Sequence, residues 1–231
     1  MVHRLIGAVW WRMRRAALAF GIVVLAASAN AQREIPGYGQ IEDYDPREVA
    51  MLPKYCPYTQ LFREKVPGGS NVEEREKWSA MLGDTFRALH HYCWGLMKLN
   101  RASFLAQSDQ ARQFYFADAV NEFDFVLRNS QDDFVLLPEI LTKKGQVLIK
   151  LGKAPIGVME LERAAQLKKD YWPPYAQLSD YYKETGNTQK AREYLEQGLS
   201  HAPDAAALKR RLHELEEPRQ AKPGTPKKAQ P

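Results

Sequence analysis

Cysteine is scarce in this sequence: the 231 residues contain only two, Cys56 and Cys93. The chain therefore has no Cys-x-x-Cys pair of the kind used by zinc sites, haem attachment or thioredoxin-like redox motifs. A Gly-x-Ser-x-Gly nucleophile motif is also missing, and Pro67-Gly68-Gly69-Ser70 lacks the Lys-Ser/Thr ending of a phosphate-binding loop. These absences predict no catalytic residue and no cofactor, and they favour a protein that is not an enzyme.

Long hydrophobic runs are equally rare, since the chain has a single one, Ala16 to Ala27. Small residues follow it at Ala29 and Ala31, and four basic residues precede it, Arg4, Arg12, Arg14 and Arg15. This order is typical of a signal peptide, which we place at residues 1–29, with cleavage after Ala31 as the alternative. Retention as a membrane anchor is less favoured because a spanning helix needs about 20 apolar residues. The sequence predicts a periplasmic or secreted protein without stable membrane insertion after cleavage.

The net charge of +5 is concentrated at the two ends of the chain. The signal segment carries four arginines and no acidic residue, and residues 218–231 carry four further basic residues without an acid. Removing both ends leaves about −3 for the central part. The high isoelectric point therefore gives no support to nucleic-acid binding, and the Pro/Lys-rich end predicts a disordered basic tail.

The central part changes character at about residue 70. Residues 30–70 contain Pro36, Pro46 and Pro53 with neighbouring glycines, which favour an irregular extension or linker. Ser70-Asn71 is suited to capping a helix. From Trp78 to Met97, and again from Phe116 to Leu127, apolar residues recur at helical spacing, so we expect a long helical hairpin over residues 71–137.

An internal repeat follows, because a shift of 34 residues aligns residues 138–171 with residues 172–205. Small or apolar residues coincide at corresponding positions: Gly145 with Ser179, Leu148 with Tyr182, Gly152 with Gly186, Gly157 with Ala191, Leu161 with Leu195, and Ala164 with Gly198. Small residues let two antiparallel helices approach closely, and a glycine can adopt the left-handed conformation that closes the first helix. Each unit is therefore predicted to be a helical hairpin.

The second unit resembles a tetratricopeptide repeat. The resemblance rests on Tyr175, Leu178, Ser179, Tyr182, Gly186, Ala191, Leu195, Gly198, Leu199 and Pro203. The first unit departs from the pattern at Lys144, Pro155 and Lys169. A degenerate third unit with longer helices is indicated upstream by Tyr92, Trp94-Gly95, Ala119, Phe123 and Val126.

The expected fold class is therefore all-α. The resemblance implies a right-handed superhelical array of hairpins, preceded by the irregular extension. Residues 206–217 have leucines on one face and charged residues mainly on the other, so they predict the capping helix that such arrays require.

The two cysteines are predicted to form a disulfide, because an exported protein enters an oxidising compartment. Such a bond would attach the extension to the first long helix, and two unpaired buried thiols are the alternative. His90-His91-Tyr92-Cys93 also invites a redox or metal-handling interpretation with Cys56. Adjacent helical residues point about 100° apart, however, so His90 and His91 do not converge on one ion, and we expect no metal site.

The resemblance implies that the first helix of each unit lines the inner wall of the array. The residues so placed are Glu139, Thr142, Gln146, Ile149, Lys150, Ala176, Asp180, Lys183 and Glu184. This wall is mixed and weakly charged, which favours another envelope protein or a peptide segment as its partner. The predicted function is an exported adaptor or scaffold of the cell envelope. A periplasmic redox or metal-handling factor and a structural homo-oligomer remain alternatives, and the oligomeric state stays open.

Overall fold

The structure, a computed structural model, describes residues 44–217, which belong to one compact unit. The predicted signal peptide and basic tail lie outside this range. Ten α-helices and two 3-10 helices make up the described part, and no strand occurs there. None of its helices combines the length and the hydrophobicity needed to cross a bilayer. The all-α expectation is therefore confirmed.

The amino-terminal segment consists of short helices joined by turns. They are α2 (Pro46–Ala50), η1 (Cys56–Tyr58), α3 (Phe62–Lys65) and α4 (Val72–Leu82). The Asp45 carboxylate accepts a hydrogen bond from the Arg47 N–H at 2.8 Å, and the Asn71 side chain accepts one from the Glu74 N–H at 3.0 Å. Each bond satisfies an amide at the start of a helix, so Asn71 caps α4.

The apolar stripe from Trp78 to Met97 does not form one continuous helix, contrary to the prediction. Helix α4 ends at Leu82, and the chain continues through η2 (Asp84–Ala88) into α5 (Leu89–Phe104). Between them Gly83 has φ 64° and ψ −158°, a conformation that essentially only glycine adopts. The backbone therefore turns at Gly83, and Met81 is left 60% exposed.

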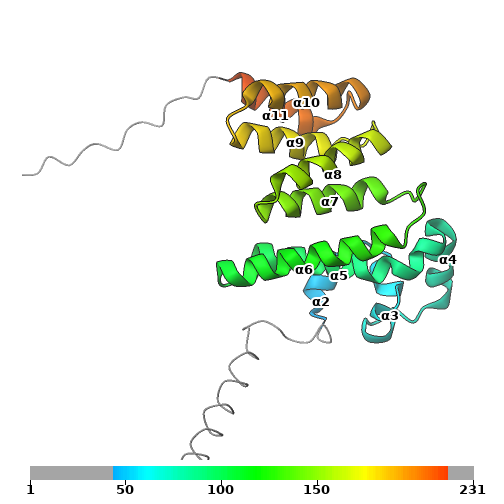
Figure 1. Ribbon diagram of the computed structural model, residues 1–231. Coiled ribbons are helices and arrows are strands. Elements are labelled where there is room, and N and C mark those ends of the chain that lie inside the picture. Colours follow the sequence, from blue (N-terminus) through cyan, green and yellow to red (C-terminus); the bar gives the residue numbers. More distant parts are fainter. Residues whose placement is uncertain (1–43, 218–231) are drawn as a thin grey trace, which may run out of the picture. The chain divides into compact units, whose positions relative to one another are not determined.

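From α5 onward the helices pack as successive antiparallel pairs (Figure 1). The first pair is α5 with α6 (Asp109–Arg128), the second α7 (Leu137–Lys150) with α8 (Ala154–Leu167), and the third α9 (Pro173–Glu184) with α10 (Thr188–His201). Gly152 and Gly186, with φ 74° and 85°, end the first helix of the second and third pairs as expected. The two 34-residue units therefore correspond to two equivalent hairpins.

Close approach of α7 and α8 explains the small residues of the repeat. A Cβ atom placed on Gly145 would lie 2.7 Å from the Gly157 carbonyl oxygen, and one on Gly157 would lie 2.7 Å from the Gly145 carbonyl oxygen. Both distances are shorter than van der Waals contact. The two backbones can therefore approach each other this closely only if both positions remain glycine.

Two clusters of buried hydrophobic residues hold the unit together. The larger one combines Leu52, Cys56 and Phe62 of the amino-terminal segment with residues of α5, α6 and α7. The smaller one joins Ala165, Tyr175, Ala176, Leu195 and Leu208. Leu208 belongs to α11 (Ala206–Glu216) and is fully buried. Helix α11 therefore covers the apolar end of the last hairpin, as expected of a capping helix.

Candidate protein-binding surface

The nine residues predicted for the inner wall lie on two neighbouring helices, α7 and α9. Thr142 and Ala176 are 5% and 1% exposed, and the Thr142 hydroxyl donates a hydrogen bond to the Pro138 carbonyl at 2.6 Å. Burial removes these two from any accessible surface, because α7 and α9 pack against helices on more than one side. The other seven are half-buried or exposed to solvent on the two helices: Glu139, Gln146, Ile149, Lys150, Asp180, Lys183 and Glu184.

The α9 part of this wall is engaged by the capping helix. Arg211 of α11 contacts the Asp180 carboxylate at 2.9 Å, and Lys183 lies 3.7 Å from Glu214. These pairs attach α11 to α9 along the predicted wall. The accessible part of the wall is therefore centred on α7. At the end of this helix the Lys150 ammonium lies 5.6 Å from the centroid of the Phe116 ring.

Lys144 is one of the three positions at which the first unit departs from the repeat pattern, and the structure explains why a lysine is tolerated there. Its ammonium contacts Asp124 of α6 at 2.7 Å and Glu160 of α8 at 2.6 Å. Burial alone lowers the pKa of Lys144, but the hydrogen bonds to Asp124 and Glu160 outweigh it, so the pKa is raised. A lysine is tolerated at this usually apolar position because two carboxylates from adjacent helices pair with it.

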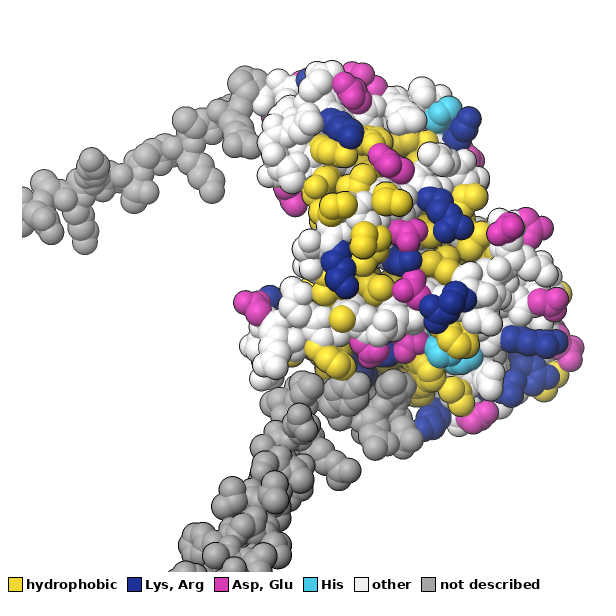
Figure 2. Space-filling model, in the orientation of Figure 1, with side chains coloured by type: hydrophobic (Ala, Val, Ile, Leu, Met, Phe, Trp, Pro, Cys, Tyr) yellow, Lys and Arg dark blue, Asp and Glu magenta, His cyan; other side chains and the backbone are white. Residues whose placement is uncertain are grey.

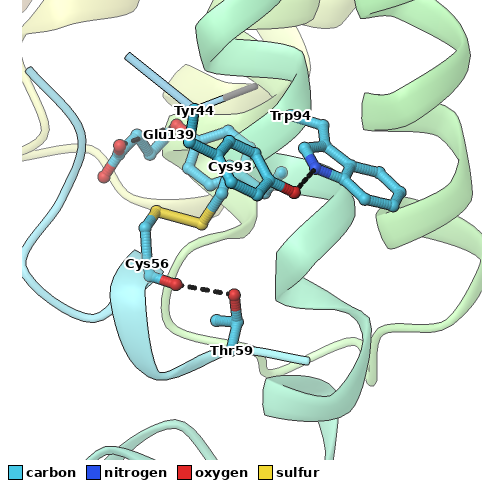
Figure 3. Close-up of a disulfide and its surroundings, with 7 residues drawn as sticks. Tyr44, Cys56, Thr59, Cys93, Trp94 and Glu139 are labelled. Atoms are coloured by element: carbon cyan, nitrogen blue, oxygen red, sulfur yellow. Dashed lines mark hydrogen bonds between the residues drawn. A yellow bond between two sulfur atoms is a disulfide. The ribbon is translucent and has the colours of Figure 1, made fainter. Parts of the chain in front are cut away.

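A disulfide joins Cys56 to Cys93, as predicted, and attaches the amino-terminal segment to α5 (Figure 3). Both cysteines are fully buried, and the Thr59 hydroxyl donates to the Cys56 carbonyl at 2.8 Å. Beside the disulfide, the indole of Trp94, the next residue of α5, donates to the Tyr44 hydroxyl at 3.0 Å. Because both sulfur atoms are bonded and shielded from solvent, neither is available as a reactive thiol.

A second attachment of this segment is the ion pair between Glu48 of α2 and Arg101 of α5. The guanidinium donates two hydrogen bonds to the two carboxylate oxygens, at 2.6 and 2.7 Å. Both side chains are mostly buried, and the two-point geometry fixes the orientation of α2. The amino-terminal segment is thus held by a covalent bond, an ion pair and a shared apolar cluster.

The amino-terminal segment encloses an apolar pocket of about 720 Å³ with α4. Its lining includes Tyr58, Trp78 and four prolines, and its charged residues are Lys54, Lys65, Glu74 and Lys77. The Trp78 indole N–H is buried and has no hydrogen-bond partner among the described residues. Sequence reasoning missed this pocket because its walls come from four separate helices, α2, η1, α3 and α4, that carry no shared motif.

Glu139, at the start of α7, lies where the amino-terminal segment meets the repeats (Figure 3). The Tyr92 hydroxyl of α5 donates a hydrogen bond to it at 2.7 Å. The pKa values of Tyr92, Tyr55 and Tyr171 are all raised, mainly by burial and secondly by the negative charge of Glu139. The pKa of Tyr171 is raised to about 12. The carboxylate is therefore electrostatically coupled to three tyrosine hydroxyls.

The rings of His90 and His91 lie beside each other, with centroids 4.3 Å apart, but their Nδ1 atoms have different partners. The Nδ1 atom of His90 lies 2.9 Å from the Arg87 carbonyl oxygen, which makes it the donor, whereas Nδ1 of His91 lies 2.5 Å from Glu122 of α6. The His91 ring also stacks on Phe125, with ring centroids 3.7 Å apart. Across residues 44–217, no group of three histidine, cysteine or acidic side chains is placed to hold a metal ion.

His90 predicts a pH dependence of stability. Burial, followed by the proximity of His91, lowers the pKa of His90 below its ordinary value of 6.5. The unfolded chain therefore binds a proton at this site more readily, and stability is lost as pH falls through 6.5 toward the folded-state pKa. We expect His90→Gln to show a shallower fall in unfolding free energy between pH 7.5 and 5.5, measured by urea unfolding. An equal fall in both proteins would contradict this role.

The successive helix pairs and the capping helix define an all-α helical-repeat protein. More particularly, residues 173–204 match the family model of the tetratricopeptide repeat, so the hairpin of α9 and α10 is a tetratricopeptide repeat. No curated protein and no solved structure matches the chain. Repeats of this family typically serve as non-catalytic interaction modules, which indicates a scaffold for protein–protein interaction.

Proposed function

We propose that this protein is an exported scaffold of the cell envelope that holds a partner protein or peptide segment against its inner wall. The proposal rests on the accessibility of one face of α7. Gln146, Ile149 and Lys150 on this face remain at least partly exposed within a rigid repeat array. A firmly packed helix face of mixed polarity suits an extended or helical segment of a partner. Because α11 pairs with α9, the partner is expected to bind mainly at α7.

Export is supported by two independent features. The signal-like segment precedes the described residues, and the buried disulfide is of a kind that persists in oxidising compartments. The redox alternative is not favoured, because it requires accessible thiols. The metal-handling alternative is not favoured because His90 and His91 are turned toward different partners. Neither the signal-like segment nor the disulfide bears on the homo-oligomer alternative.

Export is tested by fractionating cells that produce the full-length protein and measuring the mass of the purified chain. We expect it outside the cytoplasm, with an amino terminus after Ala29 or Ala31 and no thiol that reacts with an alkylating agent in denaturant. A cytoplasmic, full-length chain with two reactive thiols would overturn this part of the proposal.

Partner binding is tested by placing a photocrosslinking amino acid at single positions in living cells. Gln146 and Lys150 represent the wall, and Arg163 and Glu193, exposed on α8 and α10, are matched controls. We expect one discrete crosslinked product from the wall positions and none from the controls. Crosslinks only to a second copy of the chain would favour the homo-oligomer, and equal products at all four positions would contradict a binding wall.

A further inference from the structure

The apolar pocket between the amino-terminal segment and α4 takes no part in the proposed partner-binding wall. Its volume of about 720 Å³ lies within the range of about 300–1,000 Å³ that small-molecule sites occupy. Tyr58, Val66 and Trp78 in its lining are half-buried, and Ala50 and Pro67 are exposed. The apolar lining is therefore open to a ligand that enters from solvent.

The walls of this pocket are held in place by contacts that need no ligand. The Glu48–Arg101 ion pair orients α2, and the disulfide at Cys56 joins η1 to α5. A Cβ atom on Gly69 would lie 2.5 Å from the Pro57 carbonyl oxygen, so the turn after α3 packs directly against η1. The pocket is therefore preformed, which lowers the cost of binding.

The chemistry of the lining suits an aliphatic chain better than a peptide. Four of its residues are Pro46, Pro53, Pro57 and Pro67, and proline has no backbone N–H to offer as a donor. A peptide brings one N–H and one C=O per residue, and each needs a partner when it is buried. A hydrocarbon chain has no such need, and its burial is favourable in proportion to the apolar area removed from water.

A second recess adjoins the apolar pocket at the turn after α3. It has a volume of about 560 Å³, and Lys65, Val66 and Pro67 line both cavities. Arg63 and Arg75 line the second recess but not the first. The two cavities therefore form one continuous depression, with its apolar part between α2 and α4 and a basic part beside α3.

Positive charge is in excess along this depression. Its basic side chains are Lys54, Arg63, Lys65, Arg75 and Lys77, and its acidic ones are Glu64 and Glu74, so five positive charges stand against two negative charges. Lys77 already pairs with Glu74 at 3.0 Å. Within residues 44–217, neither Lys54 nor Arg75 is paired with an acidic side chain. The depression is thus electrostatically suited to a ligand with a negative charge.

We propose that this depression binds a single-chain anionic amphiphile, a free fatty acid. The aliphatic chain lies in the apolar pocket against Tyr58 and Trp78, and the carboxylate lies in the basic recess beside Lys65 and Arg75. A single apolar pocket matches one aliphatic chain, not the two of a phospholipid. Arginine is suited to a carboxylate because its guanidinium can donate two parallel hydrogen bonds. The site is separate from the wall of α7, so it adds a ligand to the proposed scaffold.

Calorimetric titration of the purified, oxidised protein, stripped of lipid, with dodecanoate below its micelle concentration tests this site. We expect one molecule bound per chain. Decanoate, which has two methylenes fewer, should bind about tenfold more weakly. Dodecyltrimethylammonium has the same chain and the opposite charge, and it should also bind about tenfold more weakly. Equal affinity for the anionic and cationic amphiphiles would overturn the proposal, and so would a failure of dodecanoate to bind.

Ala50→Trp tests the position of the chain. Ala50 is exposed at the end of α2 and lines the pocket, so an indole there should fill the space and weaken dodecanoate binding about tenfold. Ala80→Trp is the matched control, at an exposed position of α4 outside the lining, and it should bind as the wild type does. Equal urea-unfolding midpoints establish that both variants keep the fold. Undiminished binding by Ala50→Trp would overturn the proposal.

Arg75→Gln tests the position of the carboxylate. It should weaken dodecanoate binding about fivefold, a charge-assisted hydrogen bond reduced by partial exposure, and leave binding of uncharged dodecanol unchanged. Arg87→Gln is the matched control, an exposed arginine of η2 that lines neither cavity, and it should change neither affinity. Equal losses for dodecanoate and dodecanol in Arg75→Gln would overturn the assignment of the basic recess.

Two other occupants are distinguished with the same variants. Binding of a proline-rich peptide in preference to dodecanoate, abolished by Ala50→Trp, would show a peptide groove and overturn the proposal. Binding to phosphatidylglycerol vesicles without binding of dodecanoate in solution would show a membrane-docking surface and would also overturn it. None of these outcomes bears on the wall of α7, so the proposed function is tested separately.

Discussion

Removing the disulfide by the double substitution Cys56→Ala, Cys93→Ala is expected to lower the free energy of unfolding by about 3.8 kcal/mol, in the chain-entropy model for a loop of this span. The two cysteines are 37 residues apart, so the bond restricts a long loop of the unfolded chain. It also ties the segment that contains α2, η1 and α3 to α5. Alanine is the better replacement because both positions are fully buried, and serine would add an unpaired hydroxyl.

Urea unfolding of oxidised wild type, reduced wild type and the double variant measures this effect. Hydrogen exchange locates it: amides of residues 44–70 should exchange faster in the variant, whereas those of α9 and α10 should not change, since they belong to the other apolar cluster. A loss below 1 kcal/mol, or faster exchange spread evenly over all helices, would contradict a bond that mainly anchors the amino-terminal segment.

Lys98→Met is expected to cost about 3 kcal/mol of stability, in the range found when one partner of a buried ion pair is removed. The Lys98 side chain is 8% exposed, lies 2.7 Å from Asp118 and pairs with Glu122, both on α6. Without it, the buried Glu122 carboxylate retains only the contact with His91. The α5–α6 hairpin would then contain a poorly compensated charge.

A double-mutant cycle isolates this interaction. Combining Lys98→Met with Glu122→Gln should recover a substantial part of the loss, because the uncompensated carboxylate is removed together with its cation. Lys77→Met is the matched control: Lys77 pairs with Glu74 at 3.0 Å on the exposed side of α4, where such pairs contribute about 0.5 kcal/mol. Strict additivity of the two α5–α6 substitutions would contradict the proposed coupling.

The repeats could be predicted from the sequence because their signals are local. The spacing of Gly145, Gly157 and Leu161 reflects helix packing within one hairpin, and Gly152 and Gly186 end helices in a recognisable way. The disulfide was predictable from the presence of only two cysteines. The repeats depend on short-range backbone geometry, and the disulfide prediction depends on the number of cysteines. Neither prediction required knowledge of contacts between residues far apart in the sequence.

Other features depend on contacts that a single sequence does not display. The turn at Gly83 was missed because the apolar stripe continues at helical spacing on both sides of it. Lys144 was recognised as unusual, but its carboxylate partners lie on α6 and α8. For the candidate site, Glu139 lies on α7, but its hydrogen-bond partner Tyr92 comes from α5, a contact that the sequence does not display. Thr142 and Ala176 were assigned to the wall from repeat positions alone, which do not reveal burial by neighbouring helices.

The most direct test of the account is hydrogen–deuterium exchange of the full-length protein with and without the partner identified by crosslinking. We predict slower exchange in α7, with α8 and α10 unchanged. Protection confined to α8 and α10, or to the apolar pocket beside α4, would show that the partner binds elsewhere and would contradict the inner wall as the binding surface.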